Sequence, residues 1–247
     1  MENKTLVIVP VYNERKNVGI VINDILELKE FSVLVVDDAS PDGSAQVVKD
    51  IISKNNNVFL IERPKKLGIG TAYVTGFKWG LKKGYDYFIE MDADGSHNAE
   101  ALPWFIKEIQ NGYDVIIGSR YIGGKISVIG WDFHRLLLSK FGNFYASKLL
   151  RLPYTDITSG FRCYSKKALE SINLDAITSN GYAFQIEMIY WIKHAGLKIG
   201  EMPITFYERT AGSSKMNRRI IWEAVHLPWK LRIERLKGWY SKGIYKA

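Results

Sequence analysis

The sequence predicts an α/β fold, with a single domain built on a mainly parallel β-sheet that has helices on both faces. Five short runs of apolar, largely β-branched residues alternate with segments whose apolar residues recur at helical spacing. Such alternation is typical of β–α–β units, in which neighbouring strands are parallel. The runs are continuously apolar, which indicates strands that are buried on both faces.

The elements of this fold can be assigned in order along the chain. The strands are expected at 5–9, 32–37, 58–62, 87–92 and 114–119, and the helices at 15–30, 43–55, 68–84 and 99–111. After about residue 120 the glycine-rich loop "YIGGKIS" ends the alternation, and helices dominate the second half. We assign residues 1–215 to the main domain and residues 216–247 to C-terminal basic amphipathic helices, which Pro228 is expected to divide into two.

The chain carries an unevenly placed excess of positive charge. Its 247 residues have a net charge of +8, and the segment from Lys215 onward holds nine Lys and Arg against two Glu, or +7. Solubility does not require such a concentration of charge. The basic segment therefore indicates an anionic partner, such as phospholipid headgroups or nucleic acid.

Three features predict a cytoplasmic protein that is soluble or peripheral to a membrane. Cys163 is the only cysteine, so an internal disulfide is excluded and a reducing compartment is expected. The first apolar run breaks at Asn13 and Glu14, which makes it too short for a signal peptide. No stretch reaches the length of about 20 apolar residues that spans a bilayer.

Polar residues follow the predicted strands at the edge where open α/β sheets bind ligands, the carboxyl ends of the strands. The first strand leads into "PVYNER", and the second ends at Asp38. The fourth delivers Asp92 and Asp94, and the fifth is followed by Arg120. The topology is therefore expected to gather acidic and basic groups at one edge of the sheet.

Asp92 and Asp94 predict a divalent metal site. Residues i and i+2 of an extended segment point the same way, so both carboxylates can face one point. They repel each other unless a cation lies between them, and Mg²⁺ or Mn²⁺ suits such oxygen ligands together with phosphate and water. The alternative is a solvated loop whose acids cap the next helix. An EF-hand is excluded because its position 12 would be Ala101 rather than Glu.

Several other kinds of site are absent from the sequence. "GIGTAY" (68–73) lacks the third glycine of the dinucleotide-binding motif, and we interpret Gly68 and Gly70 as the start of a helix. No Walker A, H-E-x-x-H or G-x-S-x-G motif occurs. The histidines form no ligand cluster and are interpreted as surface or packing residues: His97, His134, His194 and His226.

Taken together, six motifs resemble glycosyltransferase family 2, whose members have the GT-A fold: "VPVYNER", "VVDDASPDG", "MDADGSH", "IGSRY", "TSGFRCYS" and "GSSK". Their order and spacing carry the resemblance from residue 5 to about 215. Motifs of the second half, "GWDFHR", "SGFRCYSKKALE", "GYAFQIEMIY" and "RTAGSSK", are similar to dolichyl-phosphate mannose synthases without transmembrane helices. The resemblance implies that mannose is transferred from GDP-mannose to a polyprenyl phosphate with inversion.

The resemblance also implies residues that bind the donor. Pro10, Tyr12 and Glu14 match the stretch that cradles the nucleotide, and Val36 and Asp38 match the part that meets the base and ribose.

Asp92, Ala93 and Asp94 match the motif that binds the metal and the diphosphate. Gly95 and Ser96 depart from the family, which often has Leu and sometimes Gln at these two positions. A third side-chain contact to the metal, from Ser96, is therefore left open.

Five further residues match basic and polar positions of the family. Arg120, Arg135 and Ser139 match positions that hold the acceptor phosphate, and Arg209 and Lys215 match a mobile loop that closes over the donor. Arginine suits these roles because its planar fork binds phosphate oxygens in pairs. We predict Asp92, Asp94 and Arg120 as the catalytic residues.

The absence of one sequence motif also favours a phosphate group as the acceptor. None of the glutamines, Gln46, Gln110 and Gln185, begins the Q-x-x-R-W motif of processive members of the superfamily. A phosphate monoester has a second pKa of about 6, so it is largely dianionic at neutral pH and needs positioning cations more than a general base.

The basic C-terminal segment predicts contact with a membrane surface. "RRIIWEAVHLPWKLRIERLKGWY" (218–240) mixes apolar and basic residues at helical spacing, and Trp222, Trp229 and Trp239 suit a headgroup interface. The alternative is a helix packed on the domain. "LLLSKFGNFYASKLLRL" (136–152) predicts a second apolar face near the lipid, although core packing explains it nearly as well. A membrane-anchoring subunit is a possible further partner.

Two other functions stay open. A polyprenyl-phosphate glucosyltransferase that uses UDP-glucose would show nearly the same motifs. A basic lipid- or nucleic-acid-binding module would share the basic segment. The acidic cluster disfavours nucleic acid, because without metal it repels phosphates.

Overall fold

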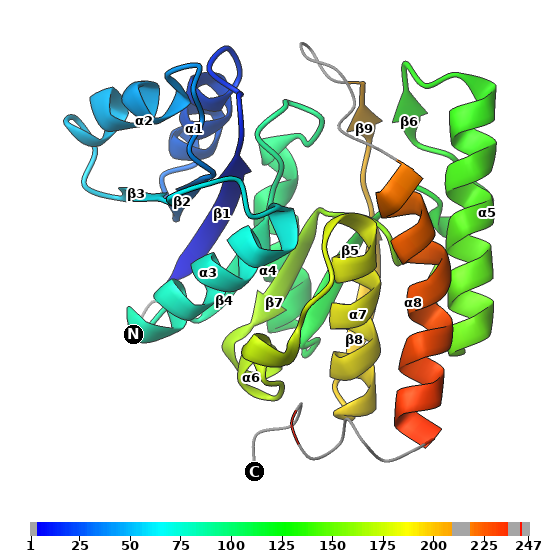
Figure 1. Ribbon diagram of the computed structural model, residues 1–247. Helices are drawn as coiled ribbons and strands as arrows, with labels where there is room; N and C mark the ends of the chain where they lie inside the picture. The colour runs from blue at the N-terminus through cyan, green and yellow to red at the C-terminus, as the bar shows by residue number, and fades with distance from the viewer. Residues whose placement is uncertain (1–3, 209–217, 237–242, 244–247) are drawn as a thin grey trace.

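The computed structural model describes residues 4–208, 218–236 and 243 (Figure 1). Its main sheet has seven strands in the order β3-β2-β1-β4-β7-β5-β8. These strands are β1 (Thr5–Val11), β2 (Phe31–Asp37), β3 (Val58–Glu62), β4 (Tyr87–Glu90), β5 (Val115–Ser119), β7 (Arg162–Ser165) and β8 (Ile199–Pro203). All pairings are parallel except those of β7, so the predicted mainly parallel sheet is confirmed.

The predicted strands and helices of the first half are confirmed to within a few residues. The connecting helices are α1 (Val18–Glu27), α2 (Ser44–Ile52), α3 (Ile69–Lys82) and α4 (Leu102–Gln110), the last preceded by the short 3-10 helix η1 (Ala99–Ala101). Gly68 is the N-cap of α3 with φ of 98°, a backbone conformation that favours glycine. The interpretation of Gly68 and Gly70 as a helix start is therefore confirmed.

Helices cover both faces of the sheet, because alternate residues of each strand point to opposite sides. Leu6 and Ile8 of β1 belong to one core cluster, which also contains residues of α3 and α7 (Gly181–His194). Val7 and Val9 belong to the other, with residues of α1 and α4. The core of the domain therefore consists of two layers, one on each side of the sheet.

The second half contains the expected helices, but the sequence pattern predicted no bounds for its elements. Besides β7, β8 and α7, they are η2 (Ile122–Gly124), β6 (Val128–Ile129), α5 (Phe133–Leu150), α6 (Lys166–Glu170), η3 (Leu174–Ala176) and β9 (Phe206–Tyr207). Strand β7 lies antiparallel between β4 and β5. Because β7 runs in the opposite direction, the loop that precedes it reaches the carboxyl ends of the parallel strands. Strand β9 pairs with β6 in a small second sheet.

The expectation that Pro228 divides the C-terminal segment into two helices is wrong. One helix, α8 (Arg218–Leu236), continues through Pro228. Proline removes one backbone hydrogen bond of the helix. However, Leu227 before the proline and Leu231 after it are both buried in the core cluster that includes residues of α5 and α7. The tertiary packing thus maintains the helix across the proline.

Helix α8 lies beside α5 and α7 (Figure 1). The Tyr145 hydroxyl donates to the Val225 carbonyl at 3.1 Å and accepts from Trp229 Nε1 at 2.8 Å. Nearer the ends of both helices, Arg232 Nη1 donates to the Leu149 carbonyl at 3.0 Å. The two helices therefore run in the same direction, and their C-terminal ends lie together. No helix among the described residues has the length and apolar character needed to cross a bilayer.

Replacing Leu231 with alanine is expected to lower the free energy of unfolding by about 2–5 kcal/mol, because its side chain is fully buried beneath α8. Ile233→Ala on the same helix is the matched control: Ile233 is 47% exposed, and a change within about 0.5 kcal/mol is expected. Urea unfolding followed by circular dichroism measures both. Similar losses for the two variants would contradict the packing of α8 on the domain.

Candidate functional site

The two predicted metal ligands lie in a short, ordered loop after β4. Asp94 is buried, and its Oδ1 accepts hydrogen bonds from the Ser96 amide at 3.1 Å and the Ser96 hydroxyl at 2.6 Å. Between them, Gly95 has φ of 76°, which lets the chain turn sharply. Ser96 therefore orients the Asp94 carboxylate.

His97 holds the other end of this loop. Its Nδ1 accepts a hydrogen bond from the Asp92 amide at 3.1 Å, which requires that nitrogen to be unprotonated. The imidazole stacks on Phe161, with ring centroids 4.5 Å apart, and meets the ring of Phe206 edge-on at 5.6 Å. The interpretation of His97 as a packing residue is confirmed. Its contacts also position the loop of residues 92–97, which we call the acidic loop.

The residues predicted to bind the nucleotide part of the sugar donor lie at the ends of β1 and β2. Pro10 and Val36 are directly opposite each other in the parallel pair. The Tyr12 ring lies 4.0 Å from Lys66 Nζ, and Glu14 accepts from Asn17 Nδ2 at 3.0 Å. Strand β1 lies between β2 and β4, so these residues border the acidic loop.

Asp38, the fifth predicted donor residue, is buried in an internal ion pair. Arg63 contacts Asp38 Oδ1, while Asp38 Oδ2 accepts from the amides of Leu67 and Gly68 at 3.0 and 2.9 Å. Asp38 thus fastens the loop before α3 beside the donor residues, and Arg63 is a residue that sequence reasoning missed.

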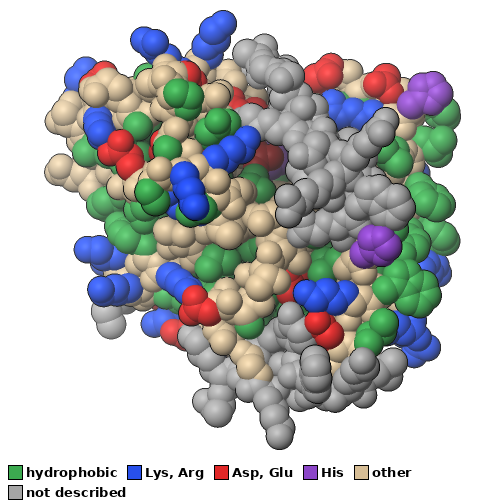
Figure 2. All heavy atoms as spheres, viewed as in Figure 1, with side chains coloured by type: hydrophobic (Ala, Val, Ile, Leu, Met, Phe, Trp, Pro, Cys, Tyr) green, Lys and Arg blue, Asp and Glu red, His purple; other side chains and the backbone are tan. Residues whose placement is uncertain are grey.

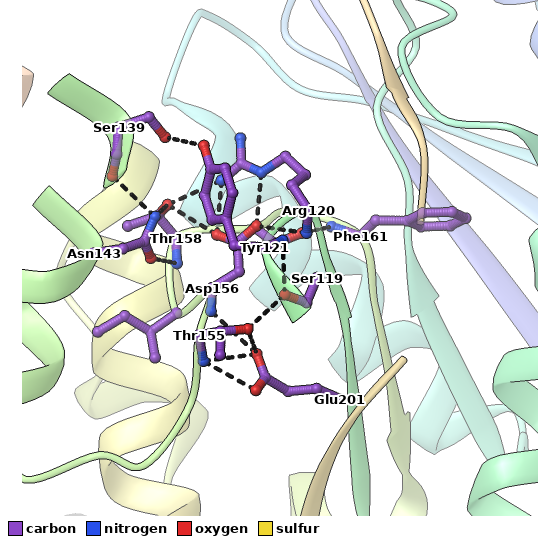
Figure 3. A network of polar contacts seen from close by, with 12 residues as sticks. Ser119, Arg120, Tyr121, Ser139, Asn143, Thr155, Asp156, Thr158, Phe161 and Glu201 are labelled. Atoms are coloured by element: carbon purple, nitrogen blue, oxygen red, sulfur yellow. Dashed lines mark hydrogen bonds and ion pairs between the residues drawn. The ribbon is translucent and has the colours of Figure 1, made fainter. Parts of the chain in front are cut away.

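Arg120 forms a buried, bidentate ion pair with Asp156 (Figure 3). Its Nε donates to Asp156 Oδ2 at 2.6 Å and its Nη2 to Oδ1 at 2.7 Å, and the two side chains are 4% and 0% exposed. Burial opposes the charge of Arg120, but the attraction and hydrogen bonds of Asp156 offset this and raise the pKa of Arg120. Nη1 donates to no residue in the described part of the chain.

A polar network holds Asp156 and connects this pair to α5 (Figure 3). Glu201 on β8 accepts from the Thr155 amide at 2.9 Å and the Asp156 amide at 3.0 Å. On the other side, the Tyr121 hydroxyl donates to Ser139 Oγ at 2.8 Å. The predicted acceptor residues Arg120 and Ser139 are therefore brought close together.

Trp131 links the two predicted acceptor arginines. The guanidinium carbons of Arg120 and Arg135 lie 5.4 and 4.2 Å from the centre of the Trp131 ring system. Arg135 also faces Glu208 at 3.6 Å, in a pair whose side chains are partly exposed. Such an ion pair contributes about 0–1 kcal/mol to the stability of a protein. Arg135 can therefore exchange Glu208 for a phosphate with little loss of free energy.

The ring of Phe206 joins the acidic and basic parts of the site. It lies 5.6 Å from the guanidinium carbon of Arg120 and 5.6 Å from the His97 ring. The next residue, Tyr207, donates from its amide to the Ser96 carbonyl at 3.1 Å, and Phe206 donates to the Ser127 carbonyl at 2.9 Å. Strand β9 therefore packs against both the acidic loop and the arginine cluster, which consists of Arg120 and Arg135 around Trp131.

The outcome for the other predicted site residues is mixed. Ala93 is buried within the acidic loop. Arg209 and Lys215 lie outside the described residues, as does the side chain of Trp222. Sequence reasoning assigned no role to Trp131, Asp156, Phe161 and Phe206, although Trp131 and Phe161 lie within the quoted motifs, because their contacts join residues far apart in the sequence.

The carboxylate oxygens of Asp92 and Asp94 suit a hard divalent cation that takes its further ligands from a substrate. Across residues 4–208, 218–236 and 243, no group of three or more His, Cys, Asp or Glu side chains is placed to hold a metal. Two carboxylates at one strand end, with phosphate and water completing the shell, are a usual arrangement for Mg²⁺. Arg120 and Arg135 lie near the same edge, so acidic and basic side chains are neighbours there.

Comparison with known proteins agrees with this geometry. Glycosyl transferase family 2 matches residues 6–172. The chain is 41% identical to polyprenol monophosphomannose synthase of Mycolicibacterium smegmatis over 95% of its own length and 91% of the relative. It is 42% identical to undecaprenyl-phosphate mannosyltransferase of Micrococcus luteus over 90% of its own length and 91% of the relative.

Solved structures of glucosyl-3-phosphoglycerate synthase from Mycobacterium tuberculosis have a similar fold. The complex with phosphoglyceric acid has a TM-score of 0.67 at 17% identity, covering 92% of this chain and 80% of that one. A complex with Mn²⁺, UDP-glucose and phosphoglyceric acid has a TM-score of 0.65 at 18% identity, with the same coverage. This likeness confirms the GT-A fold.

Asp156→Asn is expected to lower the free energy of unfolding by about 3–5 kcal/mol, because it leaves the buried charge of Arg120 without its partner. Glu62→Gln is the matched control, since it breaks an ion pair with Lys49 whose side chains are about half exposed, and a loss below about 1 kcal/mol is expected. Denaturant titration compares the two. Equal losses would show that Asp156 does not compensate a buried charge.

Proposed function

The chain belongs to glycosyltransferase family 2, and we propose that it transfers mannose from GDP-mannose to a polyprenyl phosphate, with inversion at the anomeric carbon. The names of the two relatives support the sugar and the lipid acceptor. The observation that carries the proposal is the placement of the Asp92–Asp94 loop and the arginine cluster against the same ring, Phe206. An acidic site for a metal–diphosphate and a basic site for a phosphate are then neighbours.

Asp92 and Asp94 are proposed to hold Mg²⁺ or Mn²⁺, with the donor diphosphate as the further ligand. The ion supplies stabilisation of the negative charge that grows on the diphosphate as its bond to the sugar breaks. Ser96 orients Asp94, and His97 holds the Asp92 backbone. Both contacts reduce the reorganisation that the loop needs during the reaction.

The nucleotide is proposed to lie over the ends of β1 and β2. Pro10, Tyr12 and Glu14 border it on one side and Val36 and Asp38 on the other, in keeping with their places at adjacent strand ends. Ala93 and Ser96 are proposed to lie beside the diphosphate. Arg209 and Lys215 are proposed to add positive charge there.

The acceptor phosphate is proposed to bind at Arg120, Arg135 and Ser139. One of its oxygens forms the new bond to the anomeric carbon, while the bond from that carbon to the diphosphate breaks and GDP leaves with the electron pair. Arg135 is suited to bind the incoming dianion, because its pair with Glu208 is weak and partly exposed. Arg120, fixed by Asp156, offers its remaining Nη1. No side chain has to remove a proton.

A membrane surface is the proposed place of the reaction, on the cytoplasmic face. The outer side of α5 exposes five large apolar residues, each between 52% and 72% accessible: Phe133, Leu137, Leu138, Phe141 and Phe144. Figure 2 shows apolar side chains gathered over α5 along the right edge of the molecule. Val225, Trp229 and Ile233 form an exposed stripe on the adjacent α8. An apolar surface of this extent supports contact with lipid next to the acceptor site.

Asp92→Asn and Asp94→Asn are each expected to lower the turnover number by about 100-fold or more, since each removes a negatively charged ligand of the metal ion that would stabilise the leaving diphosphate. Asp50→Asn on the exposed side of α2 is the matched control and should keep full activity. Release of GDP is measured with Mg²⁺ and a short polyprenyl phosphate, with melting temperatures as a folding check. Full activity in EDTA, or in either site variant, would exclude the proposed metal role.

GDP with Mg²⁺ is expected to raise the melting temperature more than UDP with Mg²⁺ does. A ligand at 100 times its dissociation constant stabilises the native state by about 2.7 kcal/mol, so selectivity for the base appears directly as a difference in melting temperature. Turnover with GDP-mannose and UDP-glucose is measured in parallel. A larger shift with UDP, together with consumption of UDP-glucose, would favour the glucosyltransferase alternative.

A further inference from the structure

A pocket of about 410 Å³ lies at the C-terminal ends of α5 and α8. Three arginines line it, Arg151, Arg232 and Arg235, together with Tyr190, Leu149 and Leu150. Arg151 belongs to the end of α5 and the other two to the last turns of α8, while Tyr190 comes from α7. Helices α5 and α8 thus bring three cationic side chains, and α7 brings a tyrosine, to one cavity that the proposed reaction does not use.

Within the described part of the chain, the arginines of this pocket have no acidic partners. In the described residues, none of the three forms an ion pair with an Asp or Glu side chain. Glu234 is the acidic residue beside them, and it faces Lys230 at 3.9 Å. Lys193 at the end of α7 adds further positive charge. Burial of the His194 ring, and after it the charges of Arg235 and Lys193, lower the pKa of His194, so its imidazole is neutral at neutral pH. The cavity is therefore strongly electropositive.

Helix ends account for only part of this arrangement. Cations are favourable near helix C-termini, and Arg232 Nη1 does donate to the Leu149 carbonyl at the end of α5. Arg235 instead lines the cavity together with Tyr190, and Arg151 is the residue that follows α5 as its C-cap, with φ of 55°. The guanidinium groups of Arg151 and Arg235 thus line the cavity, beside the Tyr190 hydroxyl, which donates to the Leu231 carbonyl at 3.4 Å.

We propose that this pocket binds the phosphate group of an anionic membrane lipid. Arginine forks match phosphate oxygens, and three of them more than compensate the single negative charge of a phosphodiester. The apolar face of α5 and the Val225–Trp229–Ile233 stripe of α8 lead to this pocket, so a headgroup can enter it while the acyl chains meet the apolar face. The proposal deepens the proposed function, because it rests on the membrane contact inferred there.

The position of the pocket determines how the protein would lie on the bilayer. Helix α5 has 18 residues and a length of about 27 Å, with Trp131 and Arg135 at its start and the pocket at its end. A headgroup held at the far end, with the acceptor phosphate at the near end, keeps α5 along the membrane plane. The acceptor site then faces the lipid surface.

The proposal is tested with the Arg151→Gln/Arg235→Gln double variant of the full chain, which leaves the contact of Arg232 with α5 intact. Lys125→Gln/Lys140→Gln is the control, since it removes the same charge at exposed positions outside the pocket. Sedimentation is measured with vesicles of phosphatidylcholine, alone or with phosphatidylglycerol. The pocket variant is expected to lose at least tenfold in partitioning onto phosphatidylglycerol vesicles, and the control less than threefold. Equal losses would overturn the proposal.

Arg151→Lys/Arg235→Lys separates a phosphate site from general positive charge. It keeps the charge and loses the forks, so weaker partitioning than the parent is expected; binding equal to that of the parent would overturn the proposal. Inorganic phosphate is tested as a soluble ligand through the melting temperature. If it stabilises the parent and not the glutamine variant, while vesicle binding stays unchanged, the pocket binds free phosphate and the lipid assignment is wrong.

Activity measurements distinguish failure of this proposal from failure of the proposed function. With a short, soluble acceptor, the glutamine variant is expected to match the parent, because the pocket lies a helix length from the reacting groups. An inactive parent would refute the proposed function whatever the vesicles show. A variant that loses activity on the soluble acceptor, while keeping its melting temperature, would overturn the assignment of the pocket to lipid.

Discussion

The candidate site depends on one antiparallel strand in an otherwise parallel sheet. Because β7 runs against β4 and β5, the residues before it lie at the carboxyl ends of those strands. Asp156 there pairs with Arg120, and Phe161 stacks on His97, which in turn holds the Asp92 amide. A parallel strand at this position would place both residues at the opposite edge of the sheet.

The electrostatics of the site follow from which charges are already paired. Arg120 and Asp156 are both buried and form a bidentate pair, so they neutralise each other and give a rigid base to the cluster. Arg135 is held loosely by Glu208 and stacks on Trp131. The more exposed positive charge is thus carried by Arg135, which shares the Trp131 ring with Arg120. In the proposed function, Arg135 supplies most of the charge that binds the acceptor phosphate, while the Arg120–Asp156 pair mainly maintains the local fold.

Much of the fold was predictable, because strands buried on both faces and amphipathic helices leave a periodic record in the sequence. The position of Asp92 and Asp94 at a strand end followed from the same pattern. The contact partners of Arg120 were not predictable, because Asp156 and Phe206 are far from it in the sequence. Strand β7 was not predictable either, because its four residues include the polar Arg162 and Ser165, which are not typical of a central strand. At Pro228 the sequence wrongly predicted a break between two helices. The burial of Leu227 and Leu231 outweighs the low helix propensity of proline, so α8 continues.

The central claim is that the Asp92–Asp94 loop holds the metal–diphosphate of the donor beside the arginine cluster. Anomalous diffraction from a crystal containing Mn²⁺ and GDP tests it most directly. The account predicts one Mn²⁺ peak in contact with the Asp92 and Asp94 carboxylates and with the GDP diphosphate, and the guanine over the ends of β1 and β2. Mn²⁺ and GDP bound elsewhere, for example in the pocket of about 420 Å³ lined by Glu100, Trp104 and Glu108, would contradict it.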